Sequence, residues 1–385
     1  MERRTFLKIL SSAGIVSLVS PTFAMEVCKN KVSKSSSALL ESAFRNPPFS
    51  SGVYTWWHWM NGNITKDGIT RDLEAMKANG IAGYQLFEAG SGIPIGPVES
   101  LSDEWVDLIL HTLKESERLG LEFAMHNCPG WSSSGGPWIT PDKAMQIITW
   151  SETKITGGKQ VRIQLPTPKH MFDYYIDTYC LAIPANMKVI PRLSILELSN
   201  RLDKDGVLTW DVPTGEWLIM RFGQTAKDQK NKSAPSKSTG LDCDKFSTEA
   251  LDYHLNCMFK RLMPAMEKIA KHSKIGLLID SYETGDQDWT SDMPAYFEQS
   301  HGYELYPFLP VLANKIVESE ESTKRFLFDF RRVRADMFAE RYYGHFQKRC
   351  KEKGIITYTE PYGGNMMEEL QVAQQLDINM GEFWC

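Results

Sequence analysis

The sequence predicts an α/β protein built on a (β/α)8 barrel of the TIM type, incomplete at its C-terminal end, with a small antiparallel β insertion. Strand-then-helix units alternate on both sides of a region of short β segments, and polar or aromatic residues follow each barrel-type strand. The first unit, residues 54–63, crowds three tryptophans and a histidine into a β-prone run that ends in a turn sequence.

Three units come before the insertion, in residues 51–150, which we assign to the first part of the barrel. A helix is expected between Thr65, a capping residue, and Gly80, with apolar residues on one face. A strand at 81–88 and a helix from Ser102 to Gly120 follow. The third strand, 121–127, ends in His126 and Asn127. Alternation of this kind favours a parallel sheet.

Residues 151–226 break this rhythm with short β segments between turn signals, which predicts the antiparallel insertion. The polar stretch 227–240 is expected to be a mobile surface loop. The second part of the barrel, 227–385, then supplies three more strands, at 274–283, 355–360 and 378–384, and helices at 247–272 and 320–353. Only six barrel-type strands can be counted where a closed barrel needs eight, so a truncated chain is expected.

The N-terminus and the composition indicate an exported protein. Residues 1–24 carry paired arginines, a short apolar run and small residues before Ala24, the pattern of a twin-arginine signal peptide. Residues 25–50 are expected to be a linker. We therefore predict a periplasmic or secreted bacterial protein with no stable membrane span after cleavage. The formal charge of -5 gives no reason to expect nucleic acid as a partner.

Carboxyl, amide, imidazole and aromatic side chains collect at the predicted strand ends, where a β/α fold presents its ligand site. Two carboxyl groups in an aromatic cleft are the apparatus of glycoside hydrolysis, because one protonates the leaving oxygen and the other activates water. Each group also has a structural interpretation: a carboxylate can cap a helix or pair with a cation, a histidine can bond a backbone carbonyl, and an aromatic strand can simply be buried. The recurrence at several strand ends favours a site.

Several motifs resemble the α-L-rhamnosidases of glycoside hydrolase family 106. They are Pro47-Pro48, TWWHWMNGNITKDGITRDL at 55–73, HNCPGW at 126–131, SYE at 281–283 and INMGEFW at 378–384. The resemblance covers most of the chain from about residue 47 onward. It implies an exported, multidomain bacterial enzyme with a (β/α)8 catalytic barrel, which acts by inversion on terminal α-L-rhamnose and uses Ca²⁺ near the sugar.

Roles follow from this resemblance residue by residue. Glu283 is expected to be a catalytic carboxyl group and the general acid. Glu382 is expected to be the base or the group that positions the water, and Glu360 is the reserve. Oxygen ligands for Ca²⁺ would come from Glu88, Asn127 and Asp280. The remaining strand-end groups are expected to bind sugar: Trp57, His58, Asn61, His126, Trp131, Tyr282 and Trp384.

Two other functions stay open on the sequence alone. The chain could be a catalytically inactive carbohydrate-binding fragment, with the same pocket in an unclosed barrel. It could also be a glycosidase of the same barrel type that acts on another sugar, because the fold and the carboxyl groups do not name the sugar. A zinc-dependent amidohydrolase is disfavoured, because the first strand is not followed by an H-x-H motif.

Overall fold

The computed structural model describes residues 34–48, 51–131, 134–260, 262–269, 275–364 and 366–382. The chain divides into two compact units, 1–53 and 54–385. The first unit contains one described helix, α3 (Lys34–Arg45), inside the stretch predicted to be a linker. The predicted signal peptide, 1–24, lies outside the described residues. No helix in the described part of the chain has the length and hydrophobicity needed to cross a membrane.

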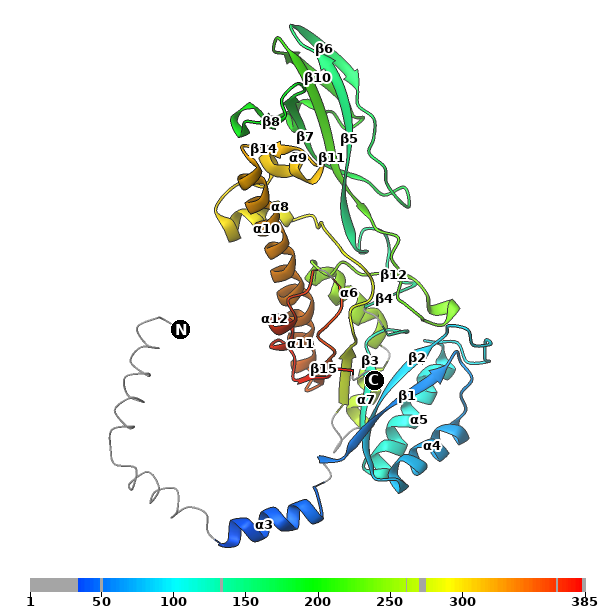
Figure 1. Ribbon diagram of the computed structural model, residues 1–385. Coiled ribbons are helices and arrows are strands. Elements are labelled where there is room, and N and C mark those ends of the chain that lie inside the picture. The colour runs from blue at the N-terminus through cyan, green and yellow to red at the C-terminus, as the bar shows by residue number, and fades with distance from the viewer. Residues whose placement is uncertain are drawn as a thin grey trace, which may run out of the picture. The chain divides into compact units, whose positions relative to one another are not determined.

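A six-stranded sheet organises the second unit, and its strand order follows the order of the chain. All six predicted barrel-type strands are present, and the pairings from β2 through β16 are parallel. The described strands do not close into a barrel, so the sheet is open (Figure 1). The strands are β1 (Val53–Met60), β2 (Ile81–Ala89), β3 (Glu122–His126), β13 (Ile275–Ile279), β15 (Ile356–Thr359) and β16 (Ile378–Asn379).

The first two helices begin and end where the sequence predicts. In α4 (Lys66–Ala78) the Thr65 side chain accepts a hydrogen bond from the Gly68 amide, and Ile69 and Leu73 are buried. In α5 (Asp103–Leu119) Ser102 caps the first turn, and Gly120 ends the helix with a left-handed backbone (φ 65°). These two helices contact each other and strands β2 and β3, so their apolar faces form the core beside the sheet.

The second half of the unit is mainly helical. The single kinked helix predicted at 247–272 is instead two helices, α6 (Thr248–Phe259) and α7 (Met263–Ile269), with Pro264 in the first turn of the second, where proline is tolerated. The helix predicted at 320–353 is continuous but contains a π-helical segment, Phe338–Gly344. The other helices are α8 (Met293–His301), α9 (Leu309–Leu312), α10 (Glu320–Met337), α11 (His345–Lys351) and α12 (Glu369–Ala373).

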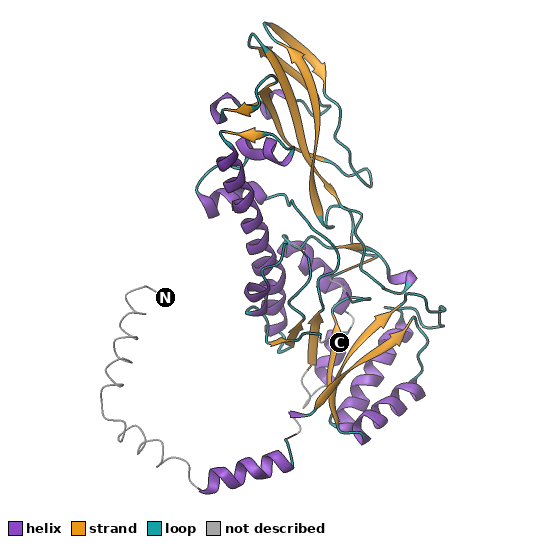
Figure 2. Ribbon diagram, viewed as in Figure 1, coloured by secondary structure: helices purple, strands orange, loops and turns teal. Residues whose placement is uncertain are grey.

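Between β3 and β13 the chain forms the antiparallel sheets seen together in Figure 2. Strand β5 pairs with β11 along its whole length, from Gln146 opposite Ala226 to Thr156 opposite Glu216. A second core lies between this sheet and the β6–β10 pair. The longer strands are β5 (Gln146–Thr156), β6 (Lys159–Gln164), β7 (Ile176–Pro184), β10 (Val207–Val212) and β11 (Glu216–Ala226). The short ones are β4 (Gly135–Gly136), β8 (Val189–Ile190), β9 (Leu196–Glu197) and β12 (Leu241–Asp242). Strand β8 pairs in parallel with β14 (Ile316–Val317), which follows β13 in the chain.

Candidate active site

A pocket of about 400 Å³ opens at the carboxyl ends of the parallel strands. Every strand of the six-stranded sheet contributes to it, because parallel strands all end at the same edge. Five of its lining residues were predicted as catalytic or sugar-binding groups: His58, Trp131, Glu283, Glu360 and Glu382. Asp280, predicted as a metal ligand, also lines it, together with Trp56, Phe87 and Ser281.

Two acidic residues share a proton on one side of the pocket. Asp280 follows β13 and Glu360 follows β15, and their side chains form a hydrogen bond. Burial and the neighbouring Glu360 carboxylate raise the pKa of Asp280 well above its ordinary value, so Asp280 carries the proton. The Tyr362 hydroxyl donates to Glu360 Oε2 over 2.7 Å and also contacts the Glu382 carboxylate. Tyr362 thus links the carboxyl groups at the ends of β15 and β16.

Glu283 has a different electrostatic environment. Burial alone raises its pKa, but an ion pair with Lys232 outweighs this effect and lowers the pKa below its ordinary value. The Ser281 hydroxyl donates to Glu283 Oε1 over 3.2 Å, and the Trp131 side chain forms a further hydrogen bond to the carboxylate. Glu283 is therefore ionised, whereas Asp280 is protonated.

Aromatic rings form another wall of the pocket. The Phe87 ring lies 3.9 Å from the His58 ring and 4.9 Å, edge-on, from the Trp56 ring, measured between centroids. Trp131 meets the Phe87 ring edge-on at 6.2 Å. Burial lowers the pKa of His58, so its imidazole is neutral near pH 7. Flat apolar faces and neutral polar edges suit the carbon and hydroxyl faces of a sugar ring.

Trp57 does not line this pocket, contrary to its predicted role. Side chains alternate along β1, so Trp56 and His58 face the pocket, whereas Trp57 and Trp59 are buried on the opposite face. The Trp57 indole nitrogen donates to Asp72 of α4 over 3.0 Å, and its ring packs against Tyr84. Trp57 is a core residue. Both faces of β1 carry aromatic residues, so the sequence did not show which face was buried.

Three other predicted sugar-binding residues are buried, and the side chain of each forms a hydrogen bond to a backbone carbonyl of a neighbouring loop. Asn61 donates to the Ile93 carbonyl over 2.7 Å and adopts the left-handed region (φ 49°), which shapes the turn after β1. Tyr282 donates to the Gly285 carbonyl over 2.6 Å and packs against Phe338. His126 bonds the Gly130 carbonyl through Nδ1 and stacks on Phe87, so it supports the aromatic wall from beneath. Trp384 lies outside the described residues.

The three predicted calcium ligands do not form a metal site with one another. Glu88 accepts a hydrogen bond from the Ser100 hydroxyl, and burial raises its pKa to about 7. Asn127 Oδ1 contacts Ser134 Oγ at 2.6 Å and His254 Nε2 at 3.0 Å. Asp280 is bound to Glu360. Among the described residues there is also no cluster of three or more His, Cys, Asp or Glu side chains that could hold a metal ion. The three residues are therefore not brought together as one set of calcium ligands, and calcium binding stays a prediction.

The segment 227–240, predicted to be a mobile surface loop, instead packs across the ends of β2 and β3; we call it the strap. Trp131 N donates to the Lys232 carbonyl over 3.3 Å, and Gly90 N donates to the Ser233 carbonyl over 2.8 Å. A Cβ atom at Gly130 would lie 2.2 Å from the Lys232 carbonyl oxygen, so only glycine permits this approach. The strap brings Lys232 to Glu283.

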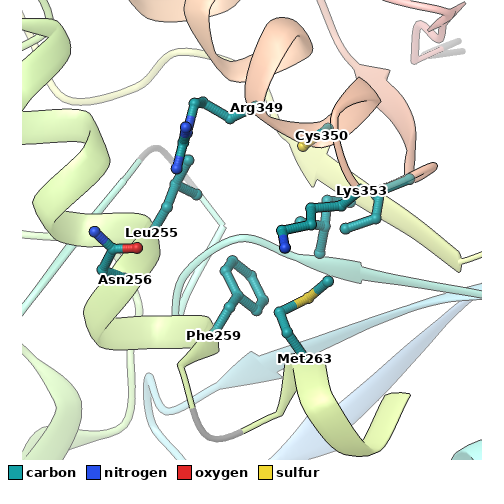
Figure 3. Close-up of a pocket in the computed structure, with 9 residues that line it drawn as sticks. Leu255, Asn256, Phe259, Met263, Arg349, Cys350 and Lys353 are labelled. Atoms are coloured by element: carbon teal, nitrogen blue, oxygen red, sulfur yellow. The ribbon is translucent and has the colours of Figure 1, made fainter. Parts of the chain in front are cut away.

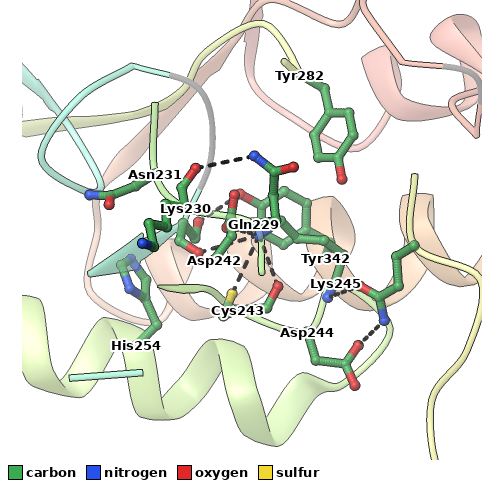
Figure 4. A network of polar contacts seen from close by, with 12 residues as sticks. Gln229, Lys230, Asn231, Asp242, Cys243, Asp244, Lys245, His254, Tyr282 and Tyr342 are labelled. Atoms are coloured by element: carbon green, nitrogen blue, oxygen red, sulfur yellow. Dashed lines mark hydrogen bonds and ion pairs between the residues drawn. The ribbon is translucent and has the colours of Figure 1, made fainter. Parts of the chain in front are cut away.

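A fully buried polar network lies where the strap returns to β12 (Figure 4). The Lys245 ammonium pairs with Asp242, donates to the Cys243 carbonyl over 3.0 Å, and sits 5.0 Å from the Tyr342 ring centroid. The neighbouring Asp244 accepts hydrogen bonds from Gln287 and Thr290, in the loop that follows Glu283. This network anchors the loop that carries Glu283.

A second pocket, of about 80 Å³, lies between α6, α7 and α11 (Figure 3). Its walls are mainly apolar, including Leu255, Phe259 and Met263. Ile355 lines it just before β15, whereas Glu360 follows that strand, so the two pockets lie at opposite ends of β15. The described residues that line it include no carboxyl group, so they offer no acid and base for catalysis.

Sequence reasoning missed five residues of the site: Trp56, Phe87, Lys232, Ser281 and Tyr362. Only the face of β1 that each side chain occupies distinguishes Trp56, which lines the pocket, from Trp57, which does not. Phe87 is buried at 4 % exposure in an apolar strand and resembles any core residue there. Lys232 gave no signal, because it is one of several lysines in a polar stretch and only the folded chain brings it to Glu283.

The chain is similar to two known proteins with names of sugar-cleaving enzymes. A curated protein of Formosa agariphila, named "Putative beta-glucuronidase", is 41% identical over 376 residues, which is 90% of this chain but 32% of that protein. The solved structure of a rhamnosidase from Novosphingobium sp. PP1Y superposes with a TM-score of 0.80 at 23% identity, over 88% of this chain and 49% of that one. The chain thus spans about a third of the curated relative and half of the solved structure.

Carboxyl groups gathered in a pocket at the carboxyl ends of parallel strands are the arrangement that glycoside hydrolysis requires. The sequence matches the profile of glycoside hydrolase family 106, described as alpha-L-rhamnosidase, over residues 45–177 and 169–385. The chain belongs to this family, as its motifs suggested.

Proposed function

We propose that this chain carries the catalytic site of an exported glycosidase that releases terminal α-L-rhamnose from a glycoside or polysaccharide with inversion. One observation carries the proposal: carboxyl groups from the ends of β13, β15 and β16 face an aromatic wall inside one pocket. The six strands would then be consecutive strands of an eight-stranded barrel of the kind common in sugar-cleaving enzymes. Export and calcium binding belong to this proposal as expectations from the sequence.

The reaction needs two carboxyl groups on opposite sides of the sugar. One gives a proton to the leaving oxygen as its bond to the anomeric carbon breaks, and the other takes a proton from the water that attacks that carbon. In this proposal Glu283 would act on one side of the sugar, and Glu360 with Glu382 on the other; all three line the pocket. For inversion we expect the two working carboxyl groups to lie ~6.5–9.5 Å apart, which leaves room for the water.

The charge of the pocket favours a neutral sugar. Four acidic residues line it, and its described lining contains no arginine or lysine. The nearby Lys232 is already paired with Glu283. A glucuronide would bring a further carboxylate into this acidic site, whereas rhamnose is uncharged and its methyl group can pack against Trp56 or Phe87. A glucuronidase is the second candidate, because of the name of the curated relative.

Hydrolysis of paired substrates tests both candidates. We expect the purified chain to release the aryl group from an aryl α-L-rhamnoside and not from an aryl β-D-glucuronide. Glu283→Gln should lower the rate by roughly 10²–10⁴-fold, the usual contribution of a general acid or base. Glu321→Gln, at an exposed glutamate on α10, is the control and should have no effect. The anomer of rhamnose first seen by NMR reports inversion. Cleavage of the glucuronide alone would overturn the rhamnosidase proposal.

A further inference from the structure

We propose that Lys232 is a positioning residue that makes Glu283 the general base of the site, which leaves the acid role to the Glu360–Glu382 side. The inference rests on the proposed hydrolysis, and it reverses the role expected for Glu283 from the sequence. It starts from where the strap holds Lys232 and from the ion pair that follows.

The strap fixes the backbone of Lys232 on both sides. Asn231 is buried, and its side-chain amide donates to the Pro129 carbonyl over 2.9 Å and to the Ser238 carbonyl over 3.1 Å. The Gly240 amide donates back to Asn231 Oδ1 over 2.8 Å, which closes the strap on itself. Further out, Lys237 pairs with Glu99 at 2.7 Å. Lys232 is therefore presented at the end of β3 by a fixed backbone, not by a free loop.

Glu283 meets its charged and titratable neighbours from several elements. Lys232 comes from the strap, Asp280 from the end of its own strand, Glu360 and Glu382 from the ends of β15 and β16, and His58 from β1. His58 is neutral, Asp280 is protonated, and Lys232 is the cation that contacts the carboxylate. Burial opposes ionisation of Glu283, and contact with Lys232 opposes its protonation.

An ionised Glu283 can accept a proton but has none to give. In the attack step the water oxygen bonds to the anomeric carbon and a water proton passes to Glu283. The bond from that carbon to the leaving oxygen breaks, and this oxygen takes a proton from the Glu360–Glu382 side, where the hydrogen bond between Asp280 and Glu360 holds one. Exchange with solvent then returns both groups to their starting states. Lys232 takes no part in proton transfer; it keeps Glu283 ionised and directs its carboxylate.

The first test does not depend on catalysis. In protein labelled with ¹³C at the glutamate carboxyl carbons, the Glu283 signal is identified by its loss in Glu283→Gln, and its titration is followed by NMR. Lys232→Met should raise the Glu283 pKa by roughly one unit or more, because an oppositely charged neighbour typically lowers a carboxyl pKa by 1–3 units. Lys232→Arg should restore the low value. Lys230→Met, on the same strap with its ammonium toward Asp228, is the matched control.

The second test uses the pH dependence of kcat/KM on the aryl rhamnoside. If Glu283 is the base, its protonation limits the rate at low pH, so Lys232→Met should move the acidic limb to higher pH and leave the alkaline limb in place. Movement of the alkaline limb instead would make Glu283 the acid and overturn the inference. An unchanged Glu283 titration in Lys232→Met would also overturn it. Absence of rhamnoside cleavage with a normal titration shift would refute the proposed function and leave the Lys232–Glu283 effect in place.

Discussion

Two lysine–carboxylate pairs lie at opposite extremes of the same site region. Lys245 and Asp242 are completely buried, with side chains 0 % exposed. Lys232 and Glu283 keep 51 % and 35 % of their side-chain surface in contact with solvent. Burial alone lowers the pKa of Lys245, but the charge of Asp242 outweighs this and raises it. Lys245 and Asp242 can each stay charged in the interior only because the other is present, whereas Lys232 and Glu283 could each remain charged alone in contact with water.

The difference separates stability from function. Removing one charge from a buried pair leaves the other without compensation in a low-dielectric interior, and this is costly. Removing one charge from a pair that meets water costs little, because water replaces the partner. We therefore expect the Lys245 pair to hold the fold together and the Lys232 pair to tune the chemistry of Glu283.

The largest expected effect is on the buried pair. Lys245→Met leaves the Asp242 carboxylate buried without its ammonium partner and should lower the free energy of unfolding by roughly 3–5 kcal/mol. Urea unfolding followed by circular dichroism measures this loss. Adding Asp242→Asn to the variant removes the stranded charge and should recover part of the stability. If Lys245→Met alone unfolds at the wild-type urea concentration, the contrast between the two pairs is wrong.

A second effect depends on pH. Burial raises the pKa of Glu88 to about 7, above the ordinary value of 4.5, so the folded state binds this proton more tightly than the unfolded state. Stability is then unaffected below about pH 4.5 and decreases as the pH rises toward 7, by about 3 kcal/mol at 1.36 kcal/mol per unit. Glu88→Gln removes this dependence, so it should be more stable than the wild type at pH 8 but not at pH 4. Equal unfolding curves at pH 8 would contradict this prediction.

The two faces of β1 give a third comparison. Trp57→Phe loses the hydrogen bond to Asp72 and some core volume, and should lower the free energy of unfolding by about 1–2 kcal/mol with little change in KM. Trp56→Phe should raise KM for the rhamnoside with a smaller loss of stability, because Trp56 lines the pocket. Thermal unfolding and steady-state kinetics of both variants measure the four values. A raised KM for Trp57→Phe alone would assign the sugar to the other face of β1.

The smallest expected effect is on the exposed pair. Lys232→Met should change the free energy of unfolding by less than about 1 kcal/mol near pH 7, as for most exposed ion pairs. Because the pair lowers the pKa of Glu283, its contribution is present above the ordinary carboxyl pKa and is lost as the pH falls through the folded-state value. Urea unfolding at pH 7 and pH 3 checks both statements. A loss as large as that of Lys245→Met would make Lys232 a structural residue.

Local patterns in the sequence were sufficient for most of the fold. Caps such as Thr65 and Ser102 and the left-handed Gly120 defined the helices, and apolar runs ending in polar groups defined all six strands of the sheet. Parallel strands have their carboxyl ends at the same edge of the sheet. The sequence was therefore enough to predict that the carboxyl groups after β13, β15 and β16 lie close together. Pro264 was predicted to kink one helix but lies in the first turn of a second one. The sequence alone allows both, because a proline in a helical pattern can bend one helix or begin another.

The rest depended on contacts between distant segments. Which of Trp56 and Trp57 faces the pocket depends on the orientation of β1. The sequence does not show this orientation, because both faces of the strand carry aromatic residues. Asn127 and Glu88 have oxygen atoms suited to a metal, but in the folded chain Asn127 bonds Ser134 and His254, and Glu88 accepts a hydrogen bond from Ser100. Composition could not show that a lysine-containing segment packs on Gly90 and Gly130 and brings one ammonium group to Glu283.

The pairing of Gln146 with Ala226 has a consequence for how this enzyme family can be engineered. The chain leaves for the antiparallel sheets and returns at two residues that face each other across one ladder, and the strap begins directly afterward at Lys227. The intervening residues therefore enter and leave through a single hairpin stem, but they also contact residues beyond β13, through the β8–β14 pair and the ion pair of Glu152 with Lys315. Shortening that stem to a tight two-residue turn would keep both ends in register and leave the strap and its lysine in place, but it would expose the surface around Tyr306 and β14 that the inserted sheets cover.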